Sequence, residues 1–288
     1  MAKNETTVFR PRSLDELDVL ASDKSRSLTY VAGATDLMVR TAKWKQVRHL
    51  VDLTAVSELH DTIEVSDGGV KIGAAVDYSR IINHPVIAGR LPLLVEACRQ
   101  IGSVQIQNRG SLGGNIANAS PAGDSLPVLA VLDASLWIGP RKNGAFEILK
   151  LDQVMTGPGQ TVLKDNRYIA FIEIPFPEQD GQFRAFRKVG QRKAMAISKL
   201  SLAVLGWRKN GVVRQIRIST GSVAPRITRH PRTEQILTGK NVTEETIDQA
   251  CNAIREEIQP ISDIRSTEEY RRHITAEVLR DVLHTVLK

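Results

Sequence analysis

The chain has 288 residues, 42% of them hydrophobic, which is enough to bury two modest cores and excludes a disordered or fibrous protein. It begins without the apolar stretch of a signal peptide and has no apolar run long enough for a membrane span, so we expect a cytoplasmic protein. The net charge is +7, but the basic residues are scattered and aromatic residues make up only 5%. A solvated surface or an acidic protein partner is therefore expected, and a nucleic acid is not.

The first part of the chain predicts a small βαβ-like lobe that ends near Leu59. Its predicted elements are a helix opened by a capping box of Ser13 and Glu16, a strand at 28–32, a helix at 36–43 and a strand at 50–53.

The next part of the chain, up to about residue 177, predicts a second lobe that starts with a hairpin. Ile63 and Val65 alternate with polar residues before the Asp67-Gly68-Gly69 turn, and Val70 and Ile72 resume the alternation. The later elements are a helix at 91–101, a glycine-rich segment, a helix at 125–133, a hairpin over 135–149 and a strand at 168–176.

The remaining residues predict a C-terminal domain in which a three-stranded sheet is backed by helices. The strands are expected at 183–189, 197–207 and 212–223, and helical apolar spacing covers 243–258 and 267–287. We therefore expect an α+β protein with one domain over 1–177, made of lobes at about 1–59 and 60–177, and a second over 178–288.

The segment from Ser111 to Asp124, SLGGNIANASPAGD, is rich in glycine, alanine, serine and asparagine. Glycine lets backbone N–H groups approach a ligand closely, while Asn115, Asn118 and Ser120 supply short polar side chains. This pattern is typical of a loop that holds a large anionic cofactor.

A second small-residue turn follows the strand at 28–32, in the sequence YVAGATDL. Amides at such a turn favour a phosphate, although Asp36 could equally be an ordinary residue at the start of a helix. Two such loops in one domain could grip a pyrophosphate from opposite sides. Neither the GxGxxG fingerprint nor the Walker pattern is present, so a Rossmann or P-loop site is not expected.

Cysteine and histidine residues show no metal-ligand spacing. Cys98 and Cys251 lie far apart within helix-like apolar patterns, which favours two buried free thiols. We expect neither an iron–sulfur cluster nor a zinc site in this chain.

Four segments occur in an order and spacing that resemble the FAD-binding medium subunit of the molybdenum hydroxylases. This is the family of xanthine dehydrogenase and aerobic carbon monoxide dehydrogenase, and the resemblance covers essentially the whole chain. The segments are YVAGATDL, NRGSLGGNIANASPAGDSLPVLAVLDA, FRKVGQRKAMAISKLSLAV and SDIRSTEEYRRHI.

The resemblance implies a two-lobed FAD-binding domain of the vanillyl-alcohol oxidase (PCMH) type plus a C-terminal domain of three strands and helices. It places both small-residue loops at the FAD pyrophosphate, Ile169 against the flavin region and Lys188 near the isoalloxazine ring. The implied FAD-binding residues are Tyr30, Ala32, Gly33, Ala34, Thr35, Asp36, Ile101, Ser111, Gly113, Gly114, Asn115, Asn118, Asp124, Ile169 and Lys188.

Two positions depart from the family pattern. Ala34 stands where many members have a second glycine, which adds a methyl group and requires backbone angles that an alanine can adopt. Ile101 stands where some members place an aromatic ring against the adenine, so a stacking contribution would be lost.

The activity implied by the resemblance is electron transfer. A large molybdenum-cofactor subunit would oxidise the substrate, a small subunit with two-iron two-sulfur clusters would relay electrons, and FAD would pass them to an acceptor such as NAD. This role demands no catalytic acid or base from the chain. Two alternatives remain: a free-standing flavin reductase or oxidase on the same fold, and a flavin-free assembly subunit.

Overall fold

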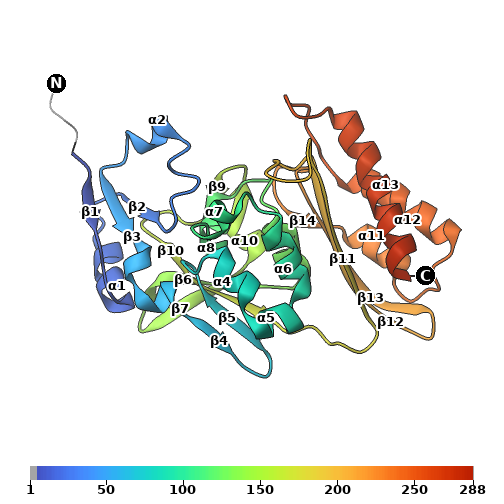
Figure 1. The fold of residues 1–288 in the computed structure, drawn as a ribbon, viewed down its shortest axis with the longest axis horizontal. Coiled ribbons are helices and arrows are strands. Elements are labelled where there is room, and N and C mark those ends of the chain that lie inside the picture. Colours follow the sequence, from blue (N-terminus) through green and yellow to red (C-terminus); the bar gives the residue numbers. More distant parts are fainter. Residues whose placement is uncertain (1–4, 288) are drawn as a thin grey trace.

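The computed structural model describes residues 5–287 and arranges them as three units in a row. Figure 1 shows the N-terminal lobe at one end, a central lobe in the middle and the C-terminal domain at the other end. The mixture of helices and sheets confirms the α+β class.

The N-terminal lobe is a small parallel sheet with a helix packed beside it. The strands are β1 (Thr7–Phe9), β2 (Leu28–Val31) and β3 (His49–Asp52), in the spatial order β1-β3-β2. Helix α1 (Leu14–Ser22) begins where the Ser13 hydroxyl accepts the Glu16 amide, and it buries Leu17 and Ala21. The short helices η1 (Leu53–Ala55) and α3 (Ser57–His60) lead out of the lobe.

The predicted helix at 36–43 is wrong. Residues 35–39 form a turn, and only α2 (Thr41–Trp44) is helical. Met38 and Val39 are 53% and 79% exposed, so the segment has no core against which its apolar side chains could pack. A short helix without such packing is marginal in water, which explains the open loop.

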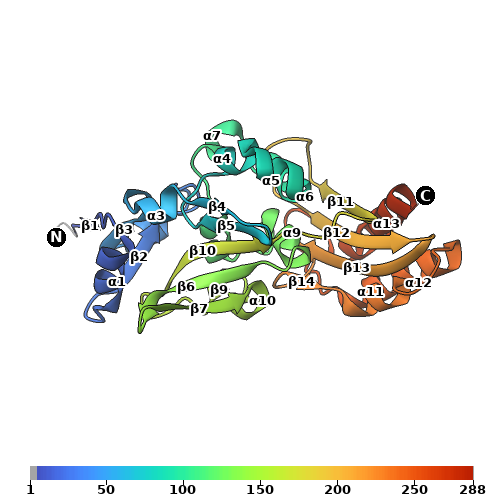
Figure 2. The ribbon, with the colours of Figure 1, turned by 90° about the horizontal axis from the view of Figure 1, so that it is seen from below.

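The central lobe is built on a five-stranded antiparallel sheet of order β4-β5-β10-β6-β7. Its strands are β4 (Ile63–Val65), β5 (Gly69–Gly73), β6 (Ser135–Lys142), β7 (Ala145–Lys150) and β10 (Tyr168–Pro175). The helices α4 (Tyr78–Asn83), α5 (Pro85–Arg90), α6 (Pro92–Arg99) and α7 (Val104–Gln107) lie together on one side, as Figure 2 shows. The lobe also contains α8 (Leu112–Asn118), α9 (Ser125–Val131), α10 (Leu151–Val154), β8 (Met155–Gly157) and β9 (Gln160–Thr161).

The C-terminal domain has four antiparallel strands where three were predicted, because the two-residue β14 adds to the edge. The strand predicted at 197–207 begins only at Leu200, since residues 190–199 form a loop closed by the Lys199 amide on the Val189 carbonyl. The strands are β11 (Gln182–Val189), β12 (Leu200–Lys209), β13 (Val212–Gly221) and β14 (Thr228–Arg229), and the helices are α11 (Pro231–Leu237), α12 (Glu244–Glu257) and α13 (Glu268–Leu287).

The two faces of the C-terminal sheet belong to different cores. On β12, Ala203 and Leu205 join the core of the central lobe, whereas Leu202 and Val204 pack with the helices on the opposite face. This is the alternation expected of a strand covered on both sides. One shared core therefore fixes the C-terminal sheet against the central lobe, with β11 beside the glycine-rich segment.

Candidate cofactor site

A cavity of about 940 Å³ lies where the two lobes meet the C-terminal domain. All three units contribute to its wall, so it forms only in the complete fold. The implied site residues found on the wall are Tyr30, Ala32, Gly33, Ala34, Thr35, Asp36, Ile101, Ser111, Gly114, Asn115, Asn118, Asp124 and Lys188.

The two small-residue loops touch each other at this wall. A Cβ atom at Gly33 would lie 1.6 Å from the Arg109 carbonyl oxygen, so only glycine permits the contact. The Asn118 side-chain amide donates to the Asp36 carboxylate over 3.0 Å and joins the loops a second time. The loops therefore form one continuous surface, although they are far apart in sequence.

The glycine-rich segment is partly helical, and its glycines have different roles. The Ser111 hydroxyl accepts the Gly114 amide over 3.1 Å and caps α8. A Cβ atom at Gly114 would meet only that hydroxyl, at 3.2 Å, so this glycine leaves open space in the cavity. A Cβ atom at Gly113 would lie 2.5 Å from Ala74, so this glycine serves packing instead.

Two of the implied residues, Gly113 and Ile169, do not line the cavity. Ile169 is 4% exposed and lies on β10 within the core of the central lobe. The structure therefore gives neither residue a direct place at the cavity wall.

Ala34 has a φ of +61°, in the left-handed region. A side chain there costs roughly 1–2 kcal/mol relative to a right-handed conformation, and glycine avoids most of this cost. Its carbonyl accepts the Met38 amide over 3.0 Å, which closes a single turn. Ala34, where the chain departs from the family pattern, is thus a conformationally strained residue in the cavity wall.

Lys188 and Asp124 form a buried ion pair across the boundary between β11 and the glycine-rich segment. The ammonium lies 2.7 Å from the carboxylate, both side chains are 8% exposed, and the ammonium also donates to the Gln100 carbonyl over 2.8 Å. The Ser198 hydroxyl donates to the other carboxylate oxygen. Burial raises the pKa of Asp124, and the opposing effects of Lys188 and Ser198 do not fully offset it. A cation is therefore held at the cavity wall by a carboxylate that is costly to bury.

Sequence reasoning missed the part of the wall that the C-terminal domain supplies. The loop at 190–199 contributes Ser198, which lies in one of the segments that carry the resemblance but is not among the implied FAD-binding residues. The segment SDIRSTEEYRRHI carries part of the resemblance, but none of its residues is among the implied FAD-binding residues. The missed wall residues from the end of β13 and from this region include Ser222, Gln259, Ile261, Asp263, Arg265 and Arg271.

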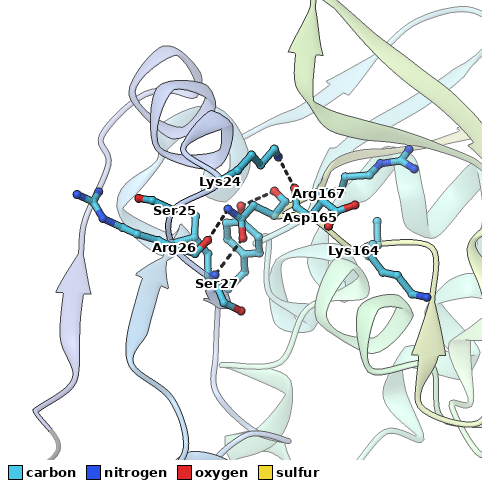
Figure 3. A pocket seen from close by; sticks show the side chains of 11 residues that line it. Lys24, Ser25, Arg26, Ser27, Lys164, Asp165 and Arg167 are labelled. Carbon is cyan, nitrogen blue, oxygen red and sulfur yellow. Dashed lines mark hydrogen bonds between the residues drawn. The ribbon is translucent and has the colours of Figure 1, made fainter.

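A second cavity, of about 700 Å³, lies between residues 24–28 and 163–167 and has a structural role. Figure 3 shows that the cationic side chains of Arg26, Lys164 and Arg167 point away from one another. The Asn166 side chain accepts the Leu28 amide and donates to two carbonyls of the 23–26 loop. These bonds join the N-terminal lobe to the central lobe. Since the cationic side chains do not point toward a common centre, the cavity is not arranged to bind an anion.

Cys98 and Cys251 are buried free thiols, as expected. Within residues 5–287, no group of three histidine, cysteine or acidic side chains is arranged to hold a metal ion. In the same range, no helix combines the length and the apolar character needed to cross a membrane.

The larger cavity fits a dinucleotide cofactor. Its volume is at the upper end of the range for ligand sites, about 300–1,000 Å³. The space beside Gly114, the contact between the loops and the cation of Lys188 suit a long, negatively charged ligand.

Comparison with known proteins gives two family matches that together cover most of the chain. Residues 4–177 match the FAD binding domain in molybdopterin dehydrogenase, and residues 184–286 match the CO dehydrogenase flavoprotein C-terminal domain.

Individual relatives extend along nearly the full length. The xanthine dehydrogenase FAD-binding subunit of Escherichia coli O157:H7 is 26% identical over 270 residues, covering 93% of this chain and 91% of the relative. The carbon monoxide dehydrogenase medium chain of Hydrogenophaga pseudoflava is 28% identical over 275 residues, covering 95% and 94%. A solved structure of carbon monoxide dehydrogenase from H. pseudoflava superposes with a TM-score of 0.91 at 26% identity, covering 99% of this chain and 98% of that chain.

Proposed function

The chain belongs to the family of FAD-binding subunits of molybdenum hydroxylases, and we propose that it carries electrons from a partner's iron–sulfur clusters to an acceptor such as NAD. FAD is the cofactor of this family, and the chain is an oxidoreductase flavoprotein subunit. We further propose that residues 1–177 and 178–288 are its two domains.

The observation that carries the proposal is the contact between the two small-residue loops at one large cavity, with Lys188 on the same wall. We propose that the loops around Gly33 and Gly114 hold the FAD pyrophosphate. Asp36 and Asn118 would keep the loops together through their side-chain hydrogen bond.

Bound FAD can accept electrons singly and release them as a pair, which suits a relay between iron–sulfur clusters and a hydride acceptor. We propose that Lys188 lies near the isoalloxazine ring and that its positive charge stabilises the reduced flavin. Asp124 and the Gln100 carbonyl would hold the ammonium in place. Ile101 would provide an apolar contact on the same wall.

The proposed partners follow from the family and from the names of the relatives, which include a medium chain and an FAD-binding subunit. We propose that a molybdenum-cofactor large subunit and a two-iron two-sulfur small subunit assemble with this chain. The net charge of +7 would favour an acidic surface on at least one of them.

FAD binding at this cavity is tested by Gly114→Leu, because the added side chain would occupy space that the fold leaves open. We expect a folded protein that no longer retains FAD, measured from its visible absorbance after gel filtration. Gly89→Leu is the matched control, because a Cβ atom on that exposed helical glycine meets no atom within 4 Å. Equal FAD retention in both variants would reject the cavity as the cofactor site.

The electron route is tested by purifying the native complex and by adding NADH to the flavoprotein without oxygen. Copurification of two further subunits and bleaching of the flavin absorbance by NADH are expected. Turnover with an added donor in the absence of partners would favour a free-standing reductase or oxidase. A folded chain without affinity for FAD would favour an assembly subunit.

A further inference from the structure

The C-terminal domain reaches the glycine-rich segment through a backbone hydrogen bond. The Ser222 amide, just after β13, donates to the Pro121 carbonyl over 2.7 Å. Pro121 lies between Asn118 and Asp124 in the sequence, and all three residues line the cavity. The turn at Ser222 can therefore influence the shape of the segment proposed to hold the cofactor.

The Ser222 turn has a backbone conformation that is unfavourable for serine. Its φ is +69°, in the left-handed region. The preceding Gly221 is packed so tightly that a Cβ atom would lie 2.4 Å from the Ser201 hydroxyl and 3.3 Å from the Pro121 carbonyl. A strained residue of this kind persists only where its surroundings fix it.

Arg271 of α13 fixes the peptide of Ser222. Its guanidinium donates to the Ser222 carbonyl over 2.8 Å and to the Asp263 carboxylate over 2.8 Å, and the side chain is 5% exposed. Asp263 also accepts the backbone amides of Arg265 and Ser266, so the anchor for Arg271 is itself rigidly held. The chain of contacts runs from Asp263 through Arg271 and Ser222 to Pro121.

We propose, on the basis of the FAD site proposed above, that Arg271 is a positioning residue for FAD: it holds the Ser222 turn in its left-handed conformation, and this turn shapes the glycine-rich segment. This role goes beyond helix capping or domain packing, because its effect should appear at the cofactor site. The C-terminal motif would thus be needed for tight FAD binding even though it lies outside both small-residue loops.

The main test compares Arg271→Met with Arg272→Met in the full-length chain. Arg272 lies on the same helix and also bonds to backbone, at the Arg255 and Ile258 carbonyls, but it does not reach the Ser222 turn. We expect the dissociation constant for FAD, titrated into deflavinated protein, to rise roughly tenfold in Arg271→Met and less than about twofold in Arg272→Met.

A second substitution separates positioning from general stability. Glycine adopts left-handed angles readily, and the Ser222 hydroxyl is buried without a hydrogen-bond partner among residues 5–287, so Ser222→Gly removes no bond. In the Arg271→Met background, we expect Ser222→Gly to lower the dissociation constant for FAD roughly fivefold. The proposal would be overturned if Ser222→Gly did not restore FAD affinity, or if Arg271→Met and Arg272→Met lost FAD affinity equally.

Amide hydrogen exchange gives a measurement that does not depend on FAD. Arg271→Met should accelerate exchange of the Ser222 amide in the deflavinated protein, and Arg272→Met should not. If Arg271→Met does not fold, Arg271→Lys keeps a positive charge near Asp263 but cannot make both contacts. Unchanged protection of Ser222 in a folded Arg271→Lys variant would reject the positioning role. Absent FAD binding in the wild type would instead reject the proposed function.

Discussion

Two ion pairs, each with a buried cation, reach the same glycine-rich segment by different routes. Lys188 contacts it directly through Asp124, at 2.7 Å, whereas Arg271 pairs with Asp263, at 2.8 Å, and acts through the Ser222 backbone. The first pair crosses from β11 to the central lobe, and the second lies wholly within the C-terminal segment. The two distances are nearly equal, but the pKa values of the two carboxylates differ in the direction of their shift.

The pKa values of the two aspartates are shifted in opposite directions. Burial raises the pKa of Asp124, and the donors found for its carboxylate within residues 5–287 are the side chains of Lys188 and Ser198, with no backbone amide. Burial also acts to raise the pKa of Asp263, but the amides of Arg265 and Ser266 and the charge of Arg271 outweigh it, so the net shift is downward. Asp263 is thus stabilised as an anion by its own loop, while Asp124 depends on Lys188. A costly charge at a cavity wall is typical of a functional site.

The largest expected effect that tests this difference is that of Lys188→Met. Removing the cation leaves a buried carboxylate unpaired, which typically costs about 3–5 kcal/mol. We expect a loss of that order in the free energy of unfolding of the deflavinated protein, measured by urea denaturation at neutral pH.

The loss of unfolding free energy in Lys188→Met should depend on pH. An aspartate whose pKa is raised by folding favours the folded state below its ordinary pKa of about 4, and this contribution is lost as the pH rises through the folded value. The variant should therefore be most impaired at neutral pH and recover toward pH 4. Lys199→Met is the control, because the Lys199 ammonium lies over the Tyr270 ring, 5.2 Å from the ring centre. Equal losses in both variants would contradict the dependence of Asp124 on Lys188.

The second expected effect, from Asp263→Asn, is smaller and has the opposite pH dependence. Since folding lowers the pKa of Asp263, its charge stabilises the folded state above the ordinary pKa, and that stability is lost as the pH falls through the lowered value. We expect a loss of about 1–2 kcal/mol at neutral pH that shrinks below about pH 4, measured by urea denaturation across that range.

Asp281→Asn provides the control for Asp263→Asn, because Asp281 is exposed and lies 3.7 Å from Arg187. Its substitution should change stability little at any pH. If the difference in the free energy of unfolding between wild type and Asp263→Asn increased as the pH fell, the two aspartates would not differ as described.

Features governed by local sequence were predicted well. The hairpin predicted over 135–149 is formed by β6 and β7, and the strands predicted at 197–207 and 212–223 correspond to β12 and β13. Both pairs of strands turn at an Asn-Gly pair, which supplies the positive φ angles that such turns need. The apolar spacing of α12 and α13 was equally visible. Of the FAD-binding residues that the resemblance implies, all but Gly113 and Ile169 lie on the cavity wall.

Features governed by distant contacts were not predicted. The segment at 36–43 has a helical pattern but no core to pack against, which its own sequence cannot reveal. The roles of Ser198 and Arg271 depend on Asp124 and Ser222, which lie 74 and 49 residues away. No local pattern identifies such partners, so that part of the cavity wall needed the structure.

The smallest expected effect concerns Ala34, a left-handed residue that, unlike Ser222, is bound by no buried cation among residues 5–287. Ala34→Gly should relieve a conformational cost and stabilise the deflavinated protein by about 1 kcal/mol, measured by urea denaturation. Ala32→Gly in the same loop is the control, and it should destabilise by about 0.5–1 kcal/mol because its φ is not positive. Equal destabilisation by both substitutions would show that Ala34 is not strained.

If Ala34→Gly also tightens FAD binding, the strained loop limits affinity. If it leaves affinity unchanged, the loop already has its binding conformation, and the segment that Arg271 positions is the better place to improve the site.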